Sequence, residues 1–127
     1  MERKNYTTGA PWEDIVGYSR AVKIGNQLEI SGTVAADEKG VVGKGDPYAQ
    51  TSFIIAKMEK VLLQAGFSLK DVVRTRIFVT DISRWEDVGR AHGEFFKEIK
   101  PATAMVEVSK LIDKDYLVEI EMSAVRI

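Results

Sequence analysis

Charged and apolar side chains alternate in two parts of this 127-residue sequence, one near the C-terminus and one near the middle. Near the C-terminus, Glu119 and Glu121 stand between apolar residues, and near the middle Arg74 and Arg76 stand within a mostly apolar run. Successive side chains of a β-strand point to opposite faces of a sheet. We therefore predict that carboxylates and guanidinium groups share one face of a sheet whose other face is apolar.

Proton transfer is the chemistry that Glu119 could perform. A partly buried carboxylate can have the raised pKa that a general base needs near neutral pH, and this residue is predicted on the mixed face. The alternative is that Glu119 forms a salt bridge at an interface between subunits. Both interpretations of this carboxylate stay open from the sequence.

The two arginines offer a different chemistry, the binding of an anion or of a carbonyl oxygen. Arg76 is the preferred candidate for such a contact, because strand alternation places it on the same face as the carboxylates. The competing interpretation is that Arg74 and Arg76 pair with Glu107, Glu119 or Glu121 across a subunit interface.

Other common catalytic groups are scarce. The chain has no cysteine, so it has no disulfide and no thiol nucleophile. His92 is the only histidine; it falls on the apolar stripe of a predicted helix, which favours a packed, hydrogen-bonded side chain over a catalytic one. A lone histidine without a cysteine also argues against a metal site, and Ser31 lacks a general base at any recognised spacing.

Three alternating strands, at residues 72–80, 101–108 and 117–125, are predicted to position the charged groups. The residues expected to face the core are Val73, Ile77, Val79, Ala104, Val106, Val108, Val118, Ile120, Met122 and Ala124. The residues expected on the opposite face are Arg74, Arg76, Phe78, Thr103, Met105, Glu107, Glu119, Glu121 and Ser123. Because this second face mixes charges with large apolar side chains, we expect it to be buried against a partner subunit that helps to form a small-molecule pocket.

The N-terminal third is predicted to hold an extended arm and a hairpin. Residues 1–17 combine glycine, proline and polar residues and are expected to be extended. Two alternating runs, 18–24 and 27–34, are joined by Gly25-Asn26, a pair that accepts the positive φ angles of a two-residue turn. The glycines and charges of residues 37–45 predict a loop.

Two amphipathic helices are predicted. Asp46-Pro47 supplies an N-cap and a first-turn proline for a helix that stops at Gly66. A capping box in which Ser83 is the cap predicts a second helix that runs to about residue 98.

Two glycines, Gly89 and Gly93, lie inside that second helix. Each costs about 1 kcal/mol relative to alanine. Such a cost is consistent with the close approach of another backbone or a ligand, or with a tolerated defect.

Composition limits the function classes. With 45% hydrophobic residues the chain can form one domain, residues 1–127. Eighteen basic and nineteen acidic residues, with no basic run, argue against a nucleic-acid partner. No stretch is typical of a signal peptide or a membrane span, so we expect a soluble, cytoplasmic protein without a membrane partner.

The predicted order is ββαβαββ, an α+β fold with one sheet and two helices on one face. The opposite face stays uncovered within one subunit, and packing it against copies of the same chain would bury its apolar residues.

The sequence resembles the RidA/YjgF family over nearly its whole length, from about residue 18 to residue 127. The matching blocks are Gly17-Tyr18-Ser19, Ile24-Gly25-Asn26, Ile30-Ser31-Gly32, residues 71–81, Phe95-Phe96, Pro101-Ala102 and residues 118–121. The resemblance implies a chorismate-mutase-like subunit with a mixed sheet, and a homotrimer with a central barrel and ligand clefts between subunits. It also implies hydrolysis of reactive enamines and imines to 2-keto acids and ammonia, without cofactor or metal.

The resemblance also assigns site residues. Tyr18 matches the family's pocket tyrosine, Ser31 and Gly32 match its Ser-Gly pair, and Glu119 matches the acidic residue that positions or activates water. We expect Glu119 to be catalytic and the other three to bind substrate.

The sequence departs from the family at two pocket positions. Thr103 stands where deaminating members have an arginine that binds the substrate carboxylate, and Met105 stands where a cysteine is usual. A threonine hydroxyl does not replace a guanidinium fork, so the chain resembles branches that lack this arginine.

Three functions therefore remain open. The first is a cofactor-free enamine or imine hydrolase whose pocket includes Thr103 and Met105. The second is a trimer that binds or senses a small molecule without turnover. The third is a ribonuclease or translation inhibitor, against which the neutral charge argues.

Overall fold

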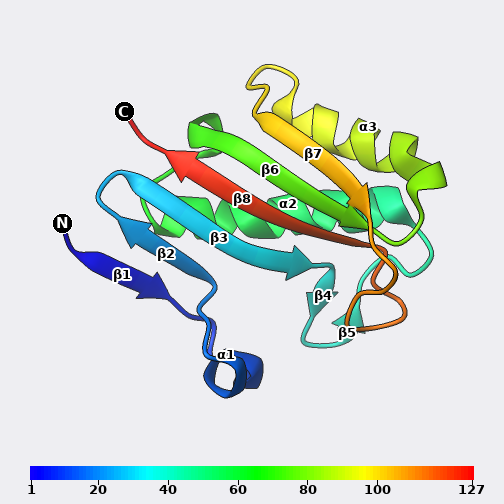
Figure 1. Cartoon of the computed structure of the whole chain (residues 1–127), viewed down its shortest axis with the longest axis horizontal. Coiled ribbons are helices and arrows are strands. Elements are labelled where there is room, and N and C mark those ends of the chain that lie inside the picture. Colours follow the sequence, from blue (N-terminus) through cyan, green and yellow to red (C-terminus); the bar gives the residue numbers. More distant parts are fainter.

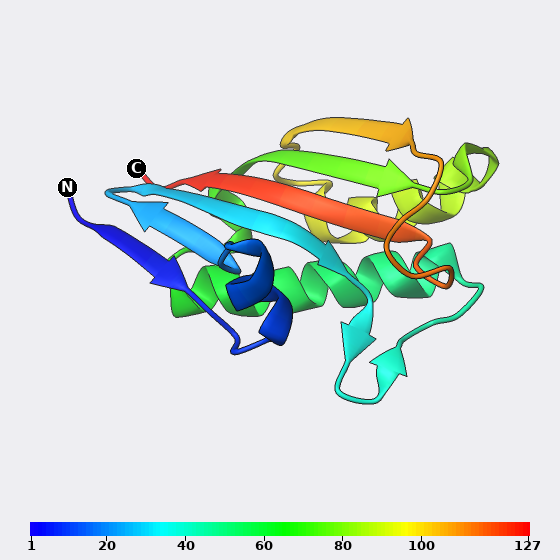
Figure 2. The same cartoon turned by 60° about the horizontal axis from the view of Figure 1, so that its bottom comes forward.

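The computed structural model describes residues 1–127. It shows a six-stranded mixed sheet with two long helices on one face (Figures 1 and 2). In their order across the sheet the strands are β1 (Arg3–Tyr6), β2 (Ala21–Ile24), β3 (Gln27–Val34), β8 (Val118–Val125), β6 (Val72–Val79) and β7 (Ala102–Glu107). Only β6 and β7 run parallel; every other neighbouring pair is antiparallel. The predicted α+β class and mixed sheet are confirmed.

The helices leave the other face of the sheet uncovered (Figure 2). The two long helices are α2 (Pro47–Gln64) and α3 (Trp85–Phe96), and the short ones are α1 (Pro11–Val16) and the 3₁₀ turns Leu69–Asp71 and Ile82–Arg84. Two-residue strands β4 (Ala36–Asp37) and β5 (Gly40–Val41) form a small separate hairpin. The hydrophobic core lies between the sheet and the long helices, as the predicted layer order requires.

The helix α2 begins and ends where the sequence predicts. The Asp46 side chain accepts a hydrogen bond from the Ala49 N–H at 3.0 Å, and Pro47 is the first helical residue. The helix ends just before Gly66, whose φ of +86° is a left-handed conformation that glycine adopts without strain. The β2–β3 hairpin is confirmed in the same way, with Gly25 at φ +60°.

The N-terminal arm is not extended throughout, contrary to the prediction. Its first part forms β1, which pairs with β2, and residues 11–16 form α1. The buried carboxylate of Glu13 anchors α1 because it accepts a hydrogen bond from the Thr8 hydroxyl at 2.6 Å. The expected loop 37–45 likewise contains most of the small β4–β5 hairpin.

The predicted capping box at the start of α3 is also wrong. Asp81 caps a 3₁₀ turn instead, accepting a hydrogen bond from the Ser83 N–H at 3.1 Å, and α3 follows with no side-chain cap of its own. The two glycines of α3 have no close backbone neighbour within the chain: a Cβ at Gly93 would meet nothing within 4 Å, and one at Gly89 would make ordinary contact with Trp85.

Strand β6 departs from simple alternation at its first residues. The register of β6 against β8 shifts between Val72 and Arg74, and this irregularity leaves Val73 46% exposed rather than in the core. After it, Ile77 and Val79 are buried as predicted.

The predicted faces of β7 are reversed. Met105 lies beside Ile77 in the parallel pair and packs against the core, whereas Val106 is 46% exposed on the open face. Apolar residues occur on both faces of this edge strand, so alternation alone does not fix which face is buried, and a shift of one residue exchanges the two.

Gln50 provides a stability test because its fully buried amide joins two loops. Its Nε2 donates to the carbonyls of Gly43 and Asp115, and its Oε1 accepts from the Leu117 N–H at 2.9 Å. We expect Gln50→Leu to lower the free energy of unfolding by about 2 kcal/mol or more, since a buried N–H then lacks its partner. Urea unfolding at fixed protein concentration measures this.

The control is Gln64→Leu, at an exposed position in the same helix. It should stay within about 0.5 kcal/mol of wild type. Equal stabilities for the two variants would contradict the role assigned to Gln50.

Candidate functional site

A cleft of about 510 Å³ lies where α1, the end of β3, the start of β8 and the loop before β8 meet. Its lining residues are Trp12, Val16, Tyr18, Arg20, Ser31, Gly32, Val34, Ile112, Tyr116, Glu119 and Glu121. Four residues predicted for the site, Tyr18, Ser31, Gly32 and Glu119, therefore come together in one place. They come from segments that are distant in the sequence, and the cleft volume suits a small metabolite.

An irregularity in β3 places the Ser31-Gly32 pair. The register against β8 shifts between Ile30 and Thr33, so these two residues leave the regular ladder beside β8. The Ser31 hydroxyl donates to the Ser19 carbonyl at 2.7 Å, and the Ser31 N–H donates to the Arg20 carbonyl at 3.0 Å. Both bonds join Ser31 in β3 to the segment before β2, and the hydroxyl proton is used in the first of them.

Gly32 makes room for the Glu119 carboxylate. A Cβ added to Gly32 would overlap Glu119 Oε2 and lie 3.0 Å from its Cδ. The backbone of Gly32 has an ordinary φ, so its missing side chain, not a special conformation, is what the site requires. The carboxylate thus lies directly against the backbone of the β3 irregularity.

Three effects set the proton affinity of Glu119. Burial raises the pKa of its carboxyl, the neighbouring charge of Glu121 raises the pKa further, and the positive charge of Arg20 lowers it. No hydrogen-bond donor of the chain contacts this half-buried carboxylate, so it is free to accept a proton from a molecule in the cleft. This is the arrangement that a general base needs.

Arg20 is the cleft residue that the sequence analysis missed. Its Nη2 donates to the Gly32 carbonyl at 2.6 Å, and its Cζ lies 5.9 Å from the centre of the Tyr18 ring. A signal was present in the sequence: Tyr18 and Arg20 are two residues apart on the approach to β2, so alternation places them on one side.

The outer rim of the cleft is apolar and exposed. Trp12 and Val16 on α1 are 59% and 69% exposed, and Ile112 in the loop before β8 is 86% exposed. Tyr116 also lines the cleft from this loop. The residue before it, Asp115, accepts a hydrogen bond from the buried Gln50 amide through its carbonyl.

Thr103 and Met105 lie outside this cleft. The Thr103 hydroxyl is 2.8 Å from the Thr75 hydroxyl, on the helix-covered face of β7, whereas Glu119 is on the open face of β8. Their predicted place on the same face as Glu119 is therefore wrong, and the cause is the reversed alternation of β7.

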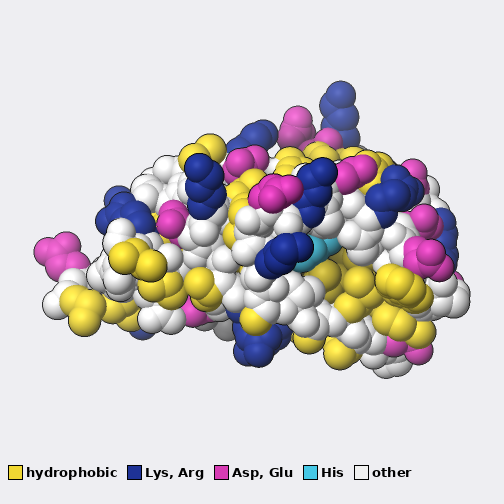
Figure 3. Space-filling view, turned by 90° about the horizontal axis from the view of Figure 1, so that it is seen from above, with side chains coloured by type: hydrophobic (Ala, Val, Ile, Leu, Met, Phe, Trp, Pro, Cys, Tyr) yellow, Lys and Arg dark blue, Asp and Glu magenta, His cyan; other side chains and the backbone are white.

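His92 is a packed, hydrogen-bonded residue. Its Nε2 lies 2.9 Å from the Thr75 hydroxyl and its ring 4.7 Å from that of Phe96, and burial lowers its pKa. Figure 3 shows the sole histidine, in cyan, reaching the surface on the side where β7 and α3 lie. This agrees with the structural interpretation of His92 and places it apart from the Glu119 cleft.

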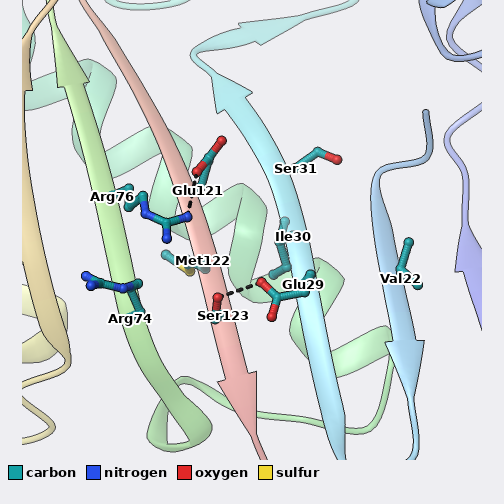
Figure 4. Close-up of a pocket in the computed structure, with 9 residues that line it drawn as sticks. All are labelled: Val22, Glu29, Ile30, Ser31, Arg74, Arg76, Glu121, Met122 and Ser123. Carbon is teal, nitrogen blue, oxygen red and sulfur yellow. Dashed lines mark hydrogen bonds and ion pairs between the residues drawn. The ribbon is translucent and has the colours of Figure 1, made fainter. Parts of the chain in front are cut away.

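Arg76 lies in a hollow of about 230 Å³ on the open face of the sheet (Figure 4), which adjoins the cleft because Ser31 and Glu121 line both. Its Nη1 is 3.4 Å from Glu121 Oε1, and the Ser123 hydroxyl donates to Glu29 at 2.6 Å across the same surface. The structure thus gives Arg76 an ion pair within its own chain, and the cation of the cleft is Arg20.

No group of three or more histidine, cysteine, aspartate or glutamate side chains is placed to hold a metal ion. None of the helices combines the length and the apolar character needed to cross a lipid bilayer.

Fold and cleft together define a small α+β domain with a half-buried carboxylate at the start of an interior strand of its sheet. A family model described as Endoribonuclease L-PSP matches residues 8–126. Rv2704 from Mycobacterium tuberculosis, a member of the YjgF/YER057c/UK114 family, is 46% identical with a TM-score of 0.89, and the match covers 98% of this chain and 100% of that one.

Two curated relatives agree with this match. A RutC family protein from Pyrococcus horikoshii is 38% identical over 125 residues, 98% of each chain. The 3-aminoacrylate deaminase RutC from Acinetobacter baylyi is 36% identical over 104 residues, 81% of this chain and 82% of that protein. The chain belongs to the RidA/YjgF family, as the sequence predicted.

The raised pKa of Glu119 predicts a pH dependence of stability. A carboxyl whose pKa is higher in the folded than in the unfolded chain favours folding while it is protonated, and this contribution is lost as pH rises through the folded pKa. We expect Glu119→Gln to be more stable than wild type at pH 7, and the difference to vanish near pH 4.

Urea unfolding across this pH range is the measurement, with exposed Glu98→Gln as control. A Glu119→Gln variant that is less stable than wild type at pH 7 would show that the carboxylate is stabilised in the fold.

Proposed function

We propose that this protein hydrolyses reactive enamines or imines of small metabolites, with release of ammonia, at the Glu119 cleft. The observation that carries the proposal is the half-buried Glu119 carboxylate, unpaired in the chain and seated against Gly32, with a pKa raised by burial and by Glu121. Membership of a family that includes a relative named 3-aminoacrylate deaminase supports the reaction class.

The chemistry needs one base and one water molecule. An enamine takes a proton from solvent on carbon and becomes an iminium ion, the same species as a protonated imine. Glu119 accepts a proton from water as the water oxygen bonds to the iminium carbon, which gives a neutral carbinolamine. Glu119 then returns this proton to the nitrogen, and ammonia leaves with the electron pair of the C–N bond as the hydroxyl group loses its proton to solvent and becomes a carbonyl. Tyr18, Ser31 and Gly32 shape the pocket in which the reacting carbon must face Glu119.

We also propose a homotrimer in which a neighbouring subunit completes the cleft. The sheet face opposite the helices is uncovered, it exposes Val106, and β7 is an edge strand with one side unpaired. Such a face and edge fit an interface between copies. Thr103 and Met105, which lie away from the cleft in their own chain, belong to this same edge strand.

Solution mass tests the assembly. Sedimentation equilibrium should give about three times the 14.2 kDa of one chain. We expect Val106→Asp to shift the mass toward the monomer, because an unpaired charge would be buried in the interface. The control is Leu63→Asp, at an exposed site on α2. A wild type that sediments as a monomer would contradict the proposed interface.

Activity is tested by ammonia release from imino acids generated in situ by an amino-acid oxidase, measured above the uncatalysed rate. Wild type should accelerate hydrolysis, and Glu119→Gln should lower kcat about a hundredfold or more. Gly32→Ala should also lose activity, since its Cβ displaces the carboxylate. Gly93→Ala, where a Cβ meets nothing, should keep it.

An inert wild type would favour the second candidate, a trimer that binds a small molecule without turnover. The presence of Thr103 where deaminating relatives are expected to have an arginine favours that candidate. Full activity in Glu119→Gln would instead remove the carboxylate from the mechanism.

A further inference from the structure

Arg20 is the only cationic side chain that lines the Glu119 cleft. The four ion pairs of the chain involve Lys44, Arg76, Arg84 and Arg90, and none of them includes Arg20. The carboxylates of Glu119 and Glu121 line the same cleft, and the charge of Arg20 acts on Glu119, but neither carboxylate forms an ion pair or a hydrogen bond with the guanidinium. The carboxylates of the chain therefore leave the hydrogen-bonding capacity of this partly buried guanidinium unused.

The guanidinium is held in one orientation. Its Nη2 is fixed by the Gly32 carbonyl at 2.6 Å, and its Nε is buried without any hydrogen-bond partner. Its Nη1 has no partner in the chain and, unlike Nε, is not buried. An arginine that is fixed at one nitrogen and has free N–H donors at another can bind an anion with little loss of side-chain entropy.

A second cation strengthens the positive potential behind Arg20. Arg20 also lines the adjoining groove of about 880 Å³, where Lys57 is half-buried and donates to the Ala36 carbonyl at 3.0 Å. Burial and the charge of Arg20 lower the pKa of Lys57, an effect that Asp37 partly offsets. Positive charge thus exceeds negative charge on this side of the cleft wall.

We propose that Arg20 binds an anionic group, such as a carboxylate, on the ligand of the Glu119 cleft. The proposal rests on the proposed function in one respect only, that this cleft is the ligand site. Arg20 would then take the part that an arginine at position 103 is expected to take in deaminating relatives, although position 103 lies outside the cleft of its own chain. The ligand class becomes a small metabolite with an acid group next to, or close to, its reacting carbon.

Anion binding at Arg20 also affects the base. Arg20 lowers the pKa of Glu119, so an anion that neutralises the guanidinium removes part of this effect. Glu119 then becomes a stronger proton acceptor when an acidic ligand is in place. Specificity and base strength would both depend on the same cation.

The experiment compares 2-oxobutanoate with its neutral methyl ester by isothermal titration calorimetry on the full-length wild type. We expect the acid to bind at least about tenfold more tightly than the ester, as for a charged hydrogen bond. Arg20→Gln should weaken binding of the acid about tenfold to a hundredfold and leave the ester unchanged. Arg20→Lys should recover part of the preference.

Arg126→Gln is the matched control, because exposed Arg126 lies outside the cleft and, like Arg20, donates to a glycine carbonyl, that of Gly66 at 2.7 Å. It should keep the preference of wild type for the acid. Circular dichroism checks that each variant is folded. If Arg20→Gln is not folded, the comparison of acid and ester on wild type still tests the proposal.

Three outcomes would overturn the role of Arg20. Wild type could bind acid and ester with equal affinity, it could bind neither, or a folded Arg20→Gln variant could keep the preference unchanged. A preference that depends on Arg20 in a protein without imine hydrolysis supports the anion site and overturns the proposed enzyme. Imine hydrolysis whose KM is unchanged in Arg20→Gln supports the enzyme and overturns the anion site.

Discussion

The contact between the Glu119 carboxylate and the backbone of Gly32 is the constraint on which the site depends. It exists because β3 leaves its regular register beside β8 at this point, and because residue 32 has no side chain. The same irregularity lets the Gly32 carbonyl hold Arg20 and lets Ser31 bond to the segment before β2. One local departure from sheet geometry therefore places a base and a cation around one small volume.

The sheet was predictable where only one face could be apolar. In β8 every core-facing residue is apolar and every other residue is polar until the strand ends, so burial and alternation agree. Strand β7 carries apolar residues on both faces, and its register is fixed instead by parallel pairing with β6, which places Met105 beside Ile77. The sequence pattern holds no information about that pairing, which is why Thr103 and Met105 were assigned to the wrong face.

The site was predictable only in part, for a related reason. Family resemblance identified Tyr18, Gly32 and Glu119, and the antiparallel pairing of β3 with β8 brings them together. Arg20 lies just before β2, outside the regular strand, and its orientation comes from a single long-range bond to Gly32. Arg76, preferred from strand alternation, does lie on the open face, but its nearest charge is Glu121. Alternation identifies a face, whereas a binding site also depends on which charges remain unpaired.

The electrostatics of the cleft follow from two charges that act on Glu119 in opposite directions. Glu121 raises the pKa of Glu119, and its own charge is partly compensated by Arg76 on the open face. Arg20 lowers the same pKa and forms no ion pair within the chain. An anionic ligand at Arg20 would shift the balance toward a more basic carboxylate, whereas a neutral ligand would leave it unchanged. The unpaired cation thus makes the strength of the base depend on the charge of the molecule that occupies the cleft.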